Sequence, residues 1–128
     1  MKCNLKIIRM SAIPVIALKR VYEASSPEDG CRILVDRLWP RGLSKENAAI
    51  DEWNKDLAPT TELRKWFHHD PKLWEGFSEK YRKELHETNL GKDFLKRHRD
   101  QEKITLVYAA KDQEHCHPVI LKQYLESL

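Results

Sequence analysis

Apolar positions along the chain follow two patterns, short dense runs and longer stretches with helical spacing. The runs at Ile13–Leu18, Arg32–Arg37 and Ile104–Ala109 are rich in Val, Ile and Leu, which predicts three strands. The centre of the second run is almost continuously apolar. Such a strand is typical of a parallel sheet that is covered on both faces.

Helical spacing dominates the middle of the chain. Thr60 is a suitable N-cap for a helix through about Phe67, and Asp70-Pro71 combines an N-cap carboxylate with a proline at the first helical position. The helix predicted from there has an apolar stripe, which we interpret as core rather than as a cofactor surface. The stripe consists of Leu73, Trp74, Phe77, Tyr81 and Leu85. A further helix is expected over Leu90–Arg99.

A last helix is predicted from Pro118 onward. Its expected buried face consists of Leu121, Tyr124, Leu125 and Leu128. Strands interleaved with helices predict an α/β fold, with a small, mainly parallel sheet flanked by helices. We expect one such domain over residues 13–128, preceded by an N-terminal arm at residues 1–12.

The composition fits a water-soluble protein of one domain. The chain has 128 residues, of which 41% are hydrophobic and 34% are charged. It has no run of about 18 apolar residues that would span a membrane. The run Ile13–Leu18 meets Lys19-Arg20 too soon for a good signal peptide. We therefore expect a cytoplasmic protein without membrane association, in which the three cysteines are reduced thiols.

Positive charge is concentrated in the first part of the chain. Residues 1–50 carry nine Lys and Arg against five Asp and Glu, although the net charge of the whole chain is only +3. This surplus is too small to indicate the broad basic face of a non-specific nucleic-acid-binding protein. It favours a local pocket for an anion.

The segment that follows the second predicted strand is the leading candidate for such a pocket. Asp36, Arg37, Trp39, Arg41 and Lys45 crowd a loop that Pro40 and Gly42 restrict. A guanidinium offers a planar fork that binds carboxylate or phosphate through two parallel hydrogen bonds. The alternatives are an Asp36–Arg salt bridge that only holds the loop, and a Trp39 that packs beneath the loop instead of stacking on a planar ligand.

A second polar loop, residues 110–117, follows the third predicted strand and contains Lys111. If the two strands are parallel neighbours, both loops open at the same edge of the sheet, where ligands of such folds bind. At the helix start, the dipole would lower the pKa of Cys116 and favour a nucleophile assisted by His115 or His117. The alternative is that Cys116 is small packing material. A zinc site lacks a second pair of ligands at a recognisable spacing, so we expect no metal.

A third cluster lies at the end of the helix that Thr60 begins. Arg64 and His68 are four residues apart and share a face of that helix, and His69 follows. Histidines in this position either cap the helix or act as a general acid or base near neutral pH. The chain has no GxSxG, Walker or GxGxxG motif, and no cofactor is expected.

Five segments together resemble one known family. They are Val35–Gly42, Trp53–Pro59, Leu63–Phe67, His69–Pro71 and Thr105–Asp112. They are similar to the YeaO-like branch of the family called domain of unknown function 488, over about residues 13–127. The resemblance implies a compact α/β domain in small bacterial or archaeal cytosolic proteins, with no established activity.

The resemblance also bears on individual site residues. The positions that it carries over as ligand-binding are Asp36, Arg37, Trp39, Arg41, Lys45, Arg64 and Lys111. Asparagine is usual in this branch near positions 116 and 117, where this chain has Cys116-His117. This departure argues against a shared cysteine chemistry.

From these observations we expect a small anionic ligand in the loop site, either a nucleotide or a phosphorylated or carboxylate metabolite. Catalysis is left open, with His68, His69, Cys116 and His117 as the candidates. The alternative is a non-enzymatic module that binds protein or nucleic acid. The sequence does not define an oligomeric state.

Overall fold

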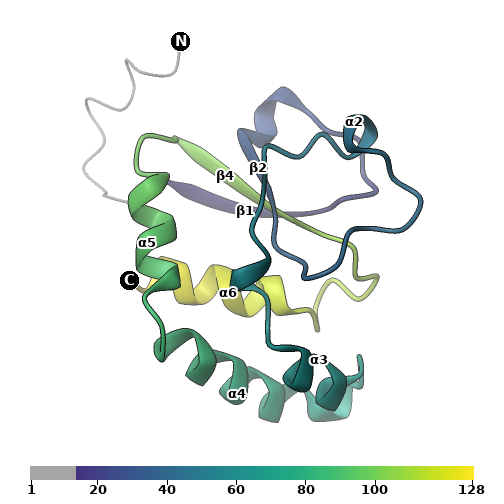
Figure 1. Ribbon diagram of the computed structural model, residues 1–128, viewed down its shortest axis with the longest axis vertical. Helices are drawn as coiled ribbons and strands as arrows, with labels where there is room; N and C mark the ends of the chain where they lie inside the picture. Colours follow the sequence, from purple (N-terminus) through teal and green to yellow (C-terminus); the bar gives the residue numbers. More distant parts are fainter. Residues whose placement is uncertain (1–13) are drawn as a thin grey trace.

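The computed structural model describes residues 14–128 and shows a parallel four-stranded sheet with helices packed against it (Figure 1). The strands are β1 (Val15–Arg20), β2 (Cys31–Leu34), β3 (Glu52–Trp53) and β4 (Lys103–Tyr108). Their order is β1-β4-β2-β3, and every neighbouring pair is parallel. The predicted α/β class, with one domain and a parallel sheet, is confirmed. The arm expected at residues 1–12 lies outside the described residues.

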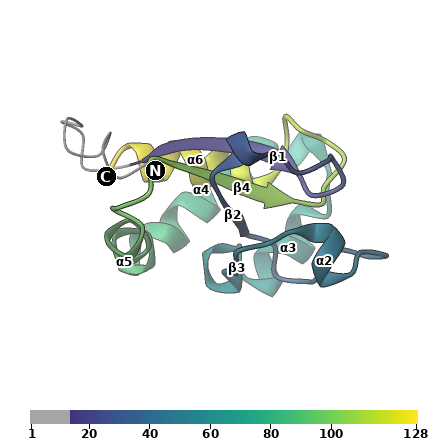
Figure 2. The same cartoon turned by 90° about the horizontal axis from the view of Figure 1, so that it is seen from above.

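The register places the apolar runs side by side. Ile16 is paired with Ile104, and Leu106 is paired with both Leu18 and Ile33. Figure 2 shows β1 and β4 running next to each other in the same direction. Ile33, Ile104 and Leu106 have no exposed surface, as the dense apolar runs predict.

Four helices cover one face of the sheet and enclose the main core. They are α3 (Thr61–Phe67), α4 (Trp74–His86), α5 (Leu90–Arg97) and α6 (His117–Glu126). The predicted stripe of α4 is buried at Phe77, Tyr81 and Leu85, while its first members, Leu73 and Trp74, are partly buried against the same core. None of the helices in the described part of the chain is long and apolar enough to cross a membrane.

Helix ends follow the predicted caps with small differences. Thr60 accepts a hydrogen bond from the Leu63 amide and is the N-cap of α3. Asp70 caps a short 3-10 turn, η3 (Pro71–Leu73), which leads directly into α4. The expected burial of Leu128 is wrong: α6 ends at Glu126, and Leu128 is 39% exposed.

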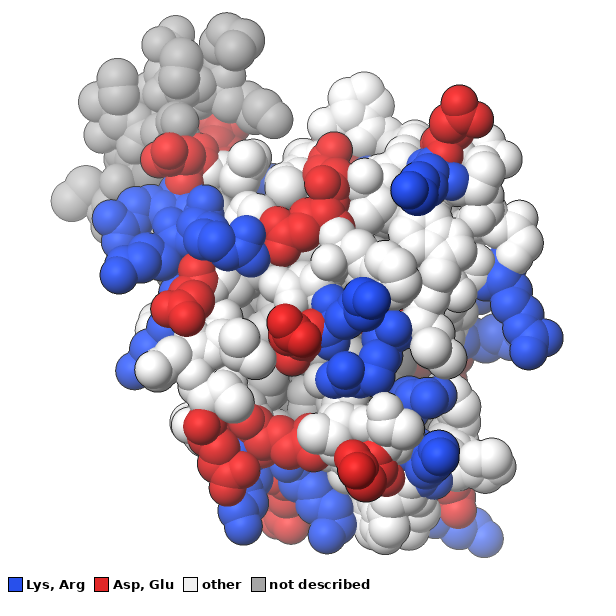
Figure 3. All heavy atoms as spheres, viewed as in Figure 1, with Lys and Arg blue, Asp and Glu red and all other residues white. Residues whose placement is uncertain are grey.

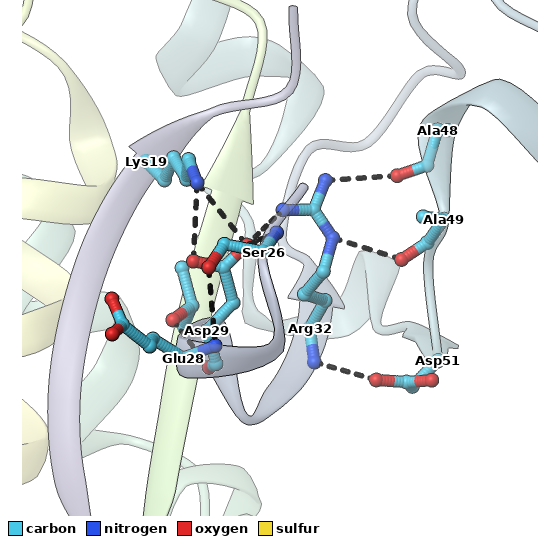
Figure 4. Close-up of polar contacts among 9 residues, drawn as sticks. Lys19, Ser26, Glu28, Asp29, Arg32, Ala48, Ala49 and Asp51 are labelled. Atoms are coloured by element: carbon cyan, nitrogen blue, oxygen red, sulfur yellow. Dashed lines mark hydrogen bonds and ion pairs between the residues drawn. The ribbon is translucent and has the colours of Figure 1, made fainter. Parts of the chain in front are cut away.

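The opposite face of the sheet is covered by short elements that the hydrophobic pattern did not predict. The 3-10 turn η2 (Lys55–Leu57), which was also not predicted, follows β3 and places Leu57 in the main core instead. The elements on the opposite face are η1 (Pro27–Asp29) and α2 (Lys45–Ala48). A buried polar network holds them (Figure 4): Arg32 forms a 2.7 Å ion pair with Asp29 and donates to the carbonyl oxygens of Ala48 and Ala49. Lys19 also pairs with Asp29, so the buried carboxylate faces two cations. Burial alone would raise the pKa of Asp29, but the Ser26 amide, Lys19 and Arg32 together lower it.

Candidate functional site

A pocket of about 750 Å³ opens at the carboxyl ends of β1, β4 and β2. This size suits a small organic molecule rather than a single ion. The pocket is lined by Tyr22, residues 36–41, Ala58, Pro59, Arg64, Phe67, His69, Phe77, residues 109–112 and residues 115–117. It lies where ligands bind in open parallel sheets.

The two loops predicted to converge do adjoin. β2 and β4 are parallel neighbours, and the Ala109 amide after β4 donates a 2.9 Å hydrogen bond to Asp36 Oδ2 after β2. Asp36 Oδ1 lies 3.8 Å from His117 Nε2, at the start of α6. The carboxyl of Asp36 thus joins the ends of both strands at the bottom of the pocket.

Asp36 has an unusual protonation equilibrium. Burial raises its pKa to about 6, although the Ala109 hydrogen bond and the positive charge of Arg64 act in the opposite direction. Within residues 14–128, Asp36 forms no salt bridge with an arginine, which was the alternative that the sequence left open. Near neutral pH the pocket therefore contains a carboxylate that is close to its protonation point.

Arg37 and Trp39 support the loop. Arg37 donates to the carbonyl oxygens of Pro59 and Ala58, at 3.0 and 3.2 Å, which ties the loop to the segment before α3. The Trp39 indole donates to the Leu43 carbonyl oxygen at 2.8 Å, and its ring meets Trp53 edge to face. Both side chains also line the pocket, so each combines a structural contact with a place in the wall.

Lys45 stands apart from the other predicted ligand-binding residues. The chain turns at Gly42, whose φ of 76° is in the left-handed region, and Ser44 then caps α2. Lys45 is the first residue of that helix and is exposed, and it does not line the pocket. The structure therefore separates Lys45 from Asp36, Arg37, Trp39 and Arg41.

Arg41, Arg64 and Lys111 bring positive charge to the pocket from three different segments. Within residues 14–128 their side chains have no hydrogen-bond or ion-pair partner, in contrast to Arg37. The charge of Arg64 nevertheless acts on the buried Asp36 carboxyl. These cations leave positive charge at the pocket that the described protein groups do not neutralise by direct pairing.

The start of α6 corrects the expectation for Cys116. Cys116 is the N-cap residue, but it is 3% exposed, and burial raises its pKa to about 11. The hydrogen bonds with the Val119 amide and the Tyr108 side chain lower this value only in part. Desolvation thus outweighs the favourable field of the helix start, and the thiol is protonated at neutral pH.

His117 is also kept neutral. Burial lowers its pKa to about 4, and the charges of Arg37 and His69 add to this effect. Its Nε2–H donates a 2.8 Å hydrogen bond to the Val35 carbonyl oxygen. In the neutral ring Nδ1 then has the free lone pair.

His68 and His69 follow one another at the end of α3 but differ in location. His68 is the C-cap residue, with its amide donating to the Arg64 carbonyl oxygen, and it does not line the pocket. His69 does line it. Both have positive φ values, 48° and 55°, which are uncommon for residues other than glycine and often accompany functional sites.

Some residues that line the pocket were not identified from the sequence. Tyr22 follows the end of β1, and Phe67 and Phe77 form an apolar wall beside the polar loops. The rule that ligands bind at strand ends would have indicated Tyr22 if β1 had been extended to Arg20. No such signal distinguishes Phe67 and Phe77 from ordinary core residues. Among residues 14–128, no three His, Cys, Asp or Glu side chains gather in a way that would hold a metal ion.

The fold and its strand-end pocket define a small parallel α/β protein, and sequence comparison places that protein in a family. Residues 15–128 match the family model DUF488-N3i, which is described as the inactive DUF488-N3 subclade. The chain belongs to this family, as the resemblance of its motifs predicted.

Similar proteins are known from several bacteria. The chain is 42% identical over 113 residues to the uncharacterized protein YeaO of Escherichia coli (strain K12), an alignment that covers 88% of this chain and 98% of YeaO. It is 37% identical over 110 residues to the uncharacterized proteins Mb3100c of Mycobacterium bovis and Rv3073c of Mycobacterium tuberculosis, covering 86% of this chain and 92% of each relative. No solved structure matches the chain significantly.

Proposed function

We propose that this protein binds a small anionic molecule in the strand-end pocket and does not convert it. The observation that carries the proposal is the set of three pocket cations, Arg41, Arg64 and Lys111, whose side chains pair with no other group of the described chain. All three residues are exposed at the pocket, and a guanidinium or ammonium group there can pair with a carboxylate or phosphate.

The acidic groups of the pocket do not cancel this charge. Asp112 already accepts hydrogen bonds from the amides of Glu114 and His115 and pairs with the His115 ring. Asp36 accepts from the Ala109 amide, and its raised pKa makes it the group that most readily becomes neutral. An incoming anion therefore meets more unpaired positive than negative charge.

Two observations support binding over turnover. The matching family model is described as an inactive subclade. In addition, the candidate nucleophile Cys116 has a raised pKa, and a protonated thiol is a poor nucleophile. His117 retains a free ring nitrogen, but among the described pocket residues we find no activated nucleophile for it to assist.

The alternative of nucleic-acid binding has less support. Proteins that bind nucleic acids without sequence preference usually present a broad face of Lys and Arg. On the face shown in Figure 3, basic and acidic side chains are interspersed. The cations at the pocket are better suited to one small ligand than to a polyanion.

A thermal-shift screen tests the proposal. The probes are inorganic phosphate, pyrophosphate, nucleoside monophosphates, sugar phosphates and dicarboxylates, each added to the wild-type protein and to Arg64→Ala. A ligand at about 100 times its dissociation constant stabilises the folded state by about 2.7 kcal/mol, which is a measurable shift for a domain of this size.

The matched control is Arg99→Ala, because Arg99 is exposed and does not line the pocket. We expect at least one phosphate or carboxylate compound to raise the melting temperature of the wild type and of the control, but not of Arg64→Ala. Equal shifts in all three proteins, or no shift with any anion, would contradict an anion site in this pocket.

A further inference from the structure

Tyr22 is an exposed aromatic residue at the rim of the pocket. It lies just beyond the carboxyl end of β1, is 45% exposed, and contributes to the pocket wall. Among the described residues its ring forms no stacked or edge-to-face pair with another aromatic ring. An exposed tyrosine ring is unremarkable by itself, but the contacts around this one are specific.

The Tyr22 ring is held in place at two points. Its hydroxyl donates a 2.9 Å hydrogen bond to the carbonyl oxygen of Arg41, in the loop between β2 and α2 (residues 35–44), which we call the cationic loop. The Arg20 guanidinium lies 5.2 Å from the centre of the ring. Arg20 is itself fixed, because it donates to the carbonyl oxygens of Ala110 and Ala109, at 2.8 and 3.1 Å.

These contacts connect the ring to both loops of the site. The hydroxyl bond attaches it to the loop after β2, and Arg20 connects it to the loop after β4. A ring that is fixed before binding loses little conformational entropy when a ligand stacks on it. The Tyr22 ring therefore has the properties of a platform for a planar group.

The pocket is also larger and less polar than an anion alone requires. Its volume of about 750 Å³ exceeds the space that a phosphate or carboxylate group fills. Leu38, Pro40 and Phe67 add apolar surface to the wall of the same pocket. A ligand that uses both the cations and this surface has an anionic end and a flat, weakly polar end.

We propose that the ligand is a phosphate ester that carries a planar ring, of the nucleoside monophosphate class, with its ring stacked on Tyr22 and its phosphate at Arg41, Arg64 and Lys111. This inference rests on the proposed function, because it names the class of anion that the pocket binds. Stacking on an aromatic side chain tolerates different bases, since every base has a π face.

Isothermal titration calorimetry with two probes separates the contribution of the planar ring to the affinity from that of the phosphate. The probes are adenosine 5′-monophosphate and ribose 5-phosphate, which share the sugar phosphate and differ in the base. The wild type is expected to bind the nucleotide about tenfold more tightly, in line with the typical contribution of one stacked base.

Variants of Tyr22 assign that difference to the ring. Tyr22→Leu removes the π face, and we expect it to bind both probes with similar affinity. Tyr22→Phe retains the ring and loses only the hydroxyl bond to Arg41, so it should keep most of the preference for the nucleotide over ribose 5-phosphate. Arg64→Ala should lower the affinity for both probes, because they share the phosphate.

A second measurement needs no variant. Nuclear Overhauser effects between the adenine protons and the Tyr22 ring protons should appear in the wild-type complex, and they remain informative if a Tyr22 variant folds poorly. Equal wild-type affinity for the two probes, or an unchanged preference in folded Tyr22→Leu, would overturn the stacking inference while leaving the anion site intact. Absence of binding by both probes would overturn this ligand class, whereas a response to other anions in the thermal-shift screen would still support the site.

Discussion

At the scale of single residues, the bottom of the pocket contains two titratable groups whose pKa values burial shifts in favour of the neutral form. The pKa of Asp36 is raised to about 6, and that of His117 is lowered to about 4. A solvent-exposed pair would be ionised at pH 5, whereas here both groups are mainly neutral. Desolvation disfavours the charged form of each group and so reverses the usual order of the two pKa values.

These pKa shifts predict opposite effects on stability. The folded state binds a proton at Asp36 more tightly than the unfolded state, so the contribution of Asp36 to stability falls as the pH rises from about 4 to about 6. His117 does the reverse: the unfolded state binds its proton more tightly, so its contribution is lost as the pH falls from about 6.5 to about 4.

Asp36→Asn therefore should become more stable relative to wild type as the pH rises from 4 to 7. A shift of about two pKa units corresponds to a change of about 3 kcal/mol in this difference. His117→Gln, whose amide can still donate to Val35, should show the opposite trend. Its stability relative to wild type should increase as the pH falls. Urea unfolding at several pH values measures both differences, and a difference that does not vary with pH would contradict the burial of that charge.

Cys116 offers a separate test at this scale. Its pKa of about 11 is two units above the ordinary thiol value of 9.0, so its thiolate fraction at neutral pH falls about 100-fold. We expect iodoacetamide to alkylate Cys116 in the folded protein at least 100-fold more slowly than in urea. Peptide mapping by mass spectrometry measures the two rates. Comparable rates would show that the thiol is accessible and ionised, and would restore it as a candidate nucleophile.

The sequence indicated that the arginines of the cationic loop lie at the site, but it did not indicate which groups they bond to. Arg37 and Arg41 lie in the same loop and have the same side chain. Arg37 donates to two carbonyl oxygens before α3, whereas Arg41 has no side-chain partner in the described chain. The difference depends on where residues 58 and 59 lie in space, which no local pattern encodes.

At the scale of elements, Arg32 holds the short α2 against the sheet. Its guanidinium pairs with Asp29 and donates to the carbonyl oxygens of Ala48 and Ala49, at the end of α2 (Figure 4). α2 has only four residues and is too short to be stable on its own. The network therefore supports the segment that continues from the cationic loop.

Arg32→Ala is expected to lower the free energy of unfolding by about 3 kcal/mol, because it leaves a buried carboxylate and two carbonyl oxygens without this partner. Arg99→Ala, at an exposed position, should change it by less than about 0.5 kcal/mol. Urea unfolding of the two variants measures the difference. Equal stability of both variants would show that Lys19 and solvent satisfy the network without Arg32.

The long elements were predictable and the short ones were not, for a physical reason. α4 and β4 have enough residues to show their period, and the caps Thr60 and Asp70 marked helix starts. β3 has two residues and no period at all. Such elements form because tertiary contacts hold them, as the network around Arg32 holds α2.

At the scale of the whole molecule, the order of the strands creates the site. β4, the last strand in the chain, lies between β1 and β2, so loops from distant parts of the sequence meet at one edge. The general rule for parallel sheets predicted the meeting of the loops after β2 and β4. It did not indicate Tyr22, because the predicted strand ended at Leu18, whereas β1 extends to Arg20.

The central claim is that this edge of the sheet binds a small anion, and a titration followed by amide chemical shifts tests it most directly. ¹⁵N-labelled protein is titrated with adenosine 5′-monophosphate and, separately, with inorganic phosphate. We predict saturable shifts concentrated at the amides of residues 36–41, 109–112 and 115–117, with Arg64→Ala abolishing them and Arg99→Ala leaving them unchanged. Shifts that do not saturate, or that scatter over exposed lysines and arginines elsewhere, would contradict the claim.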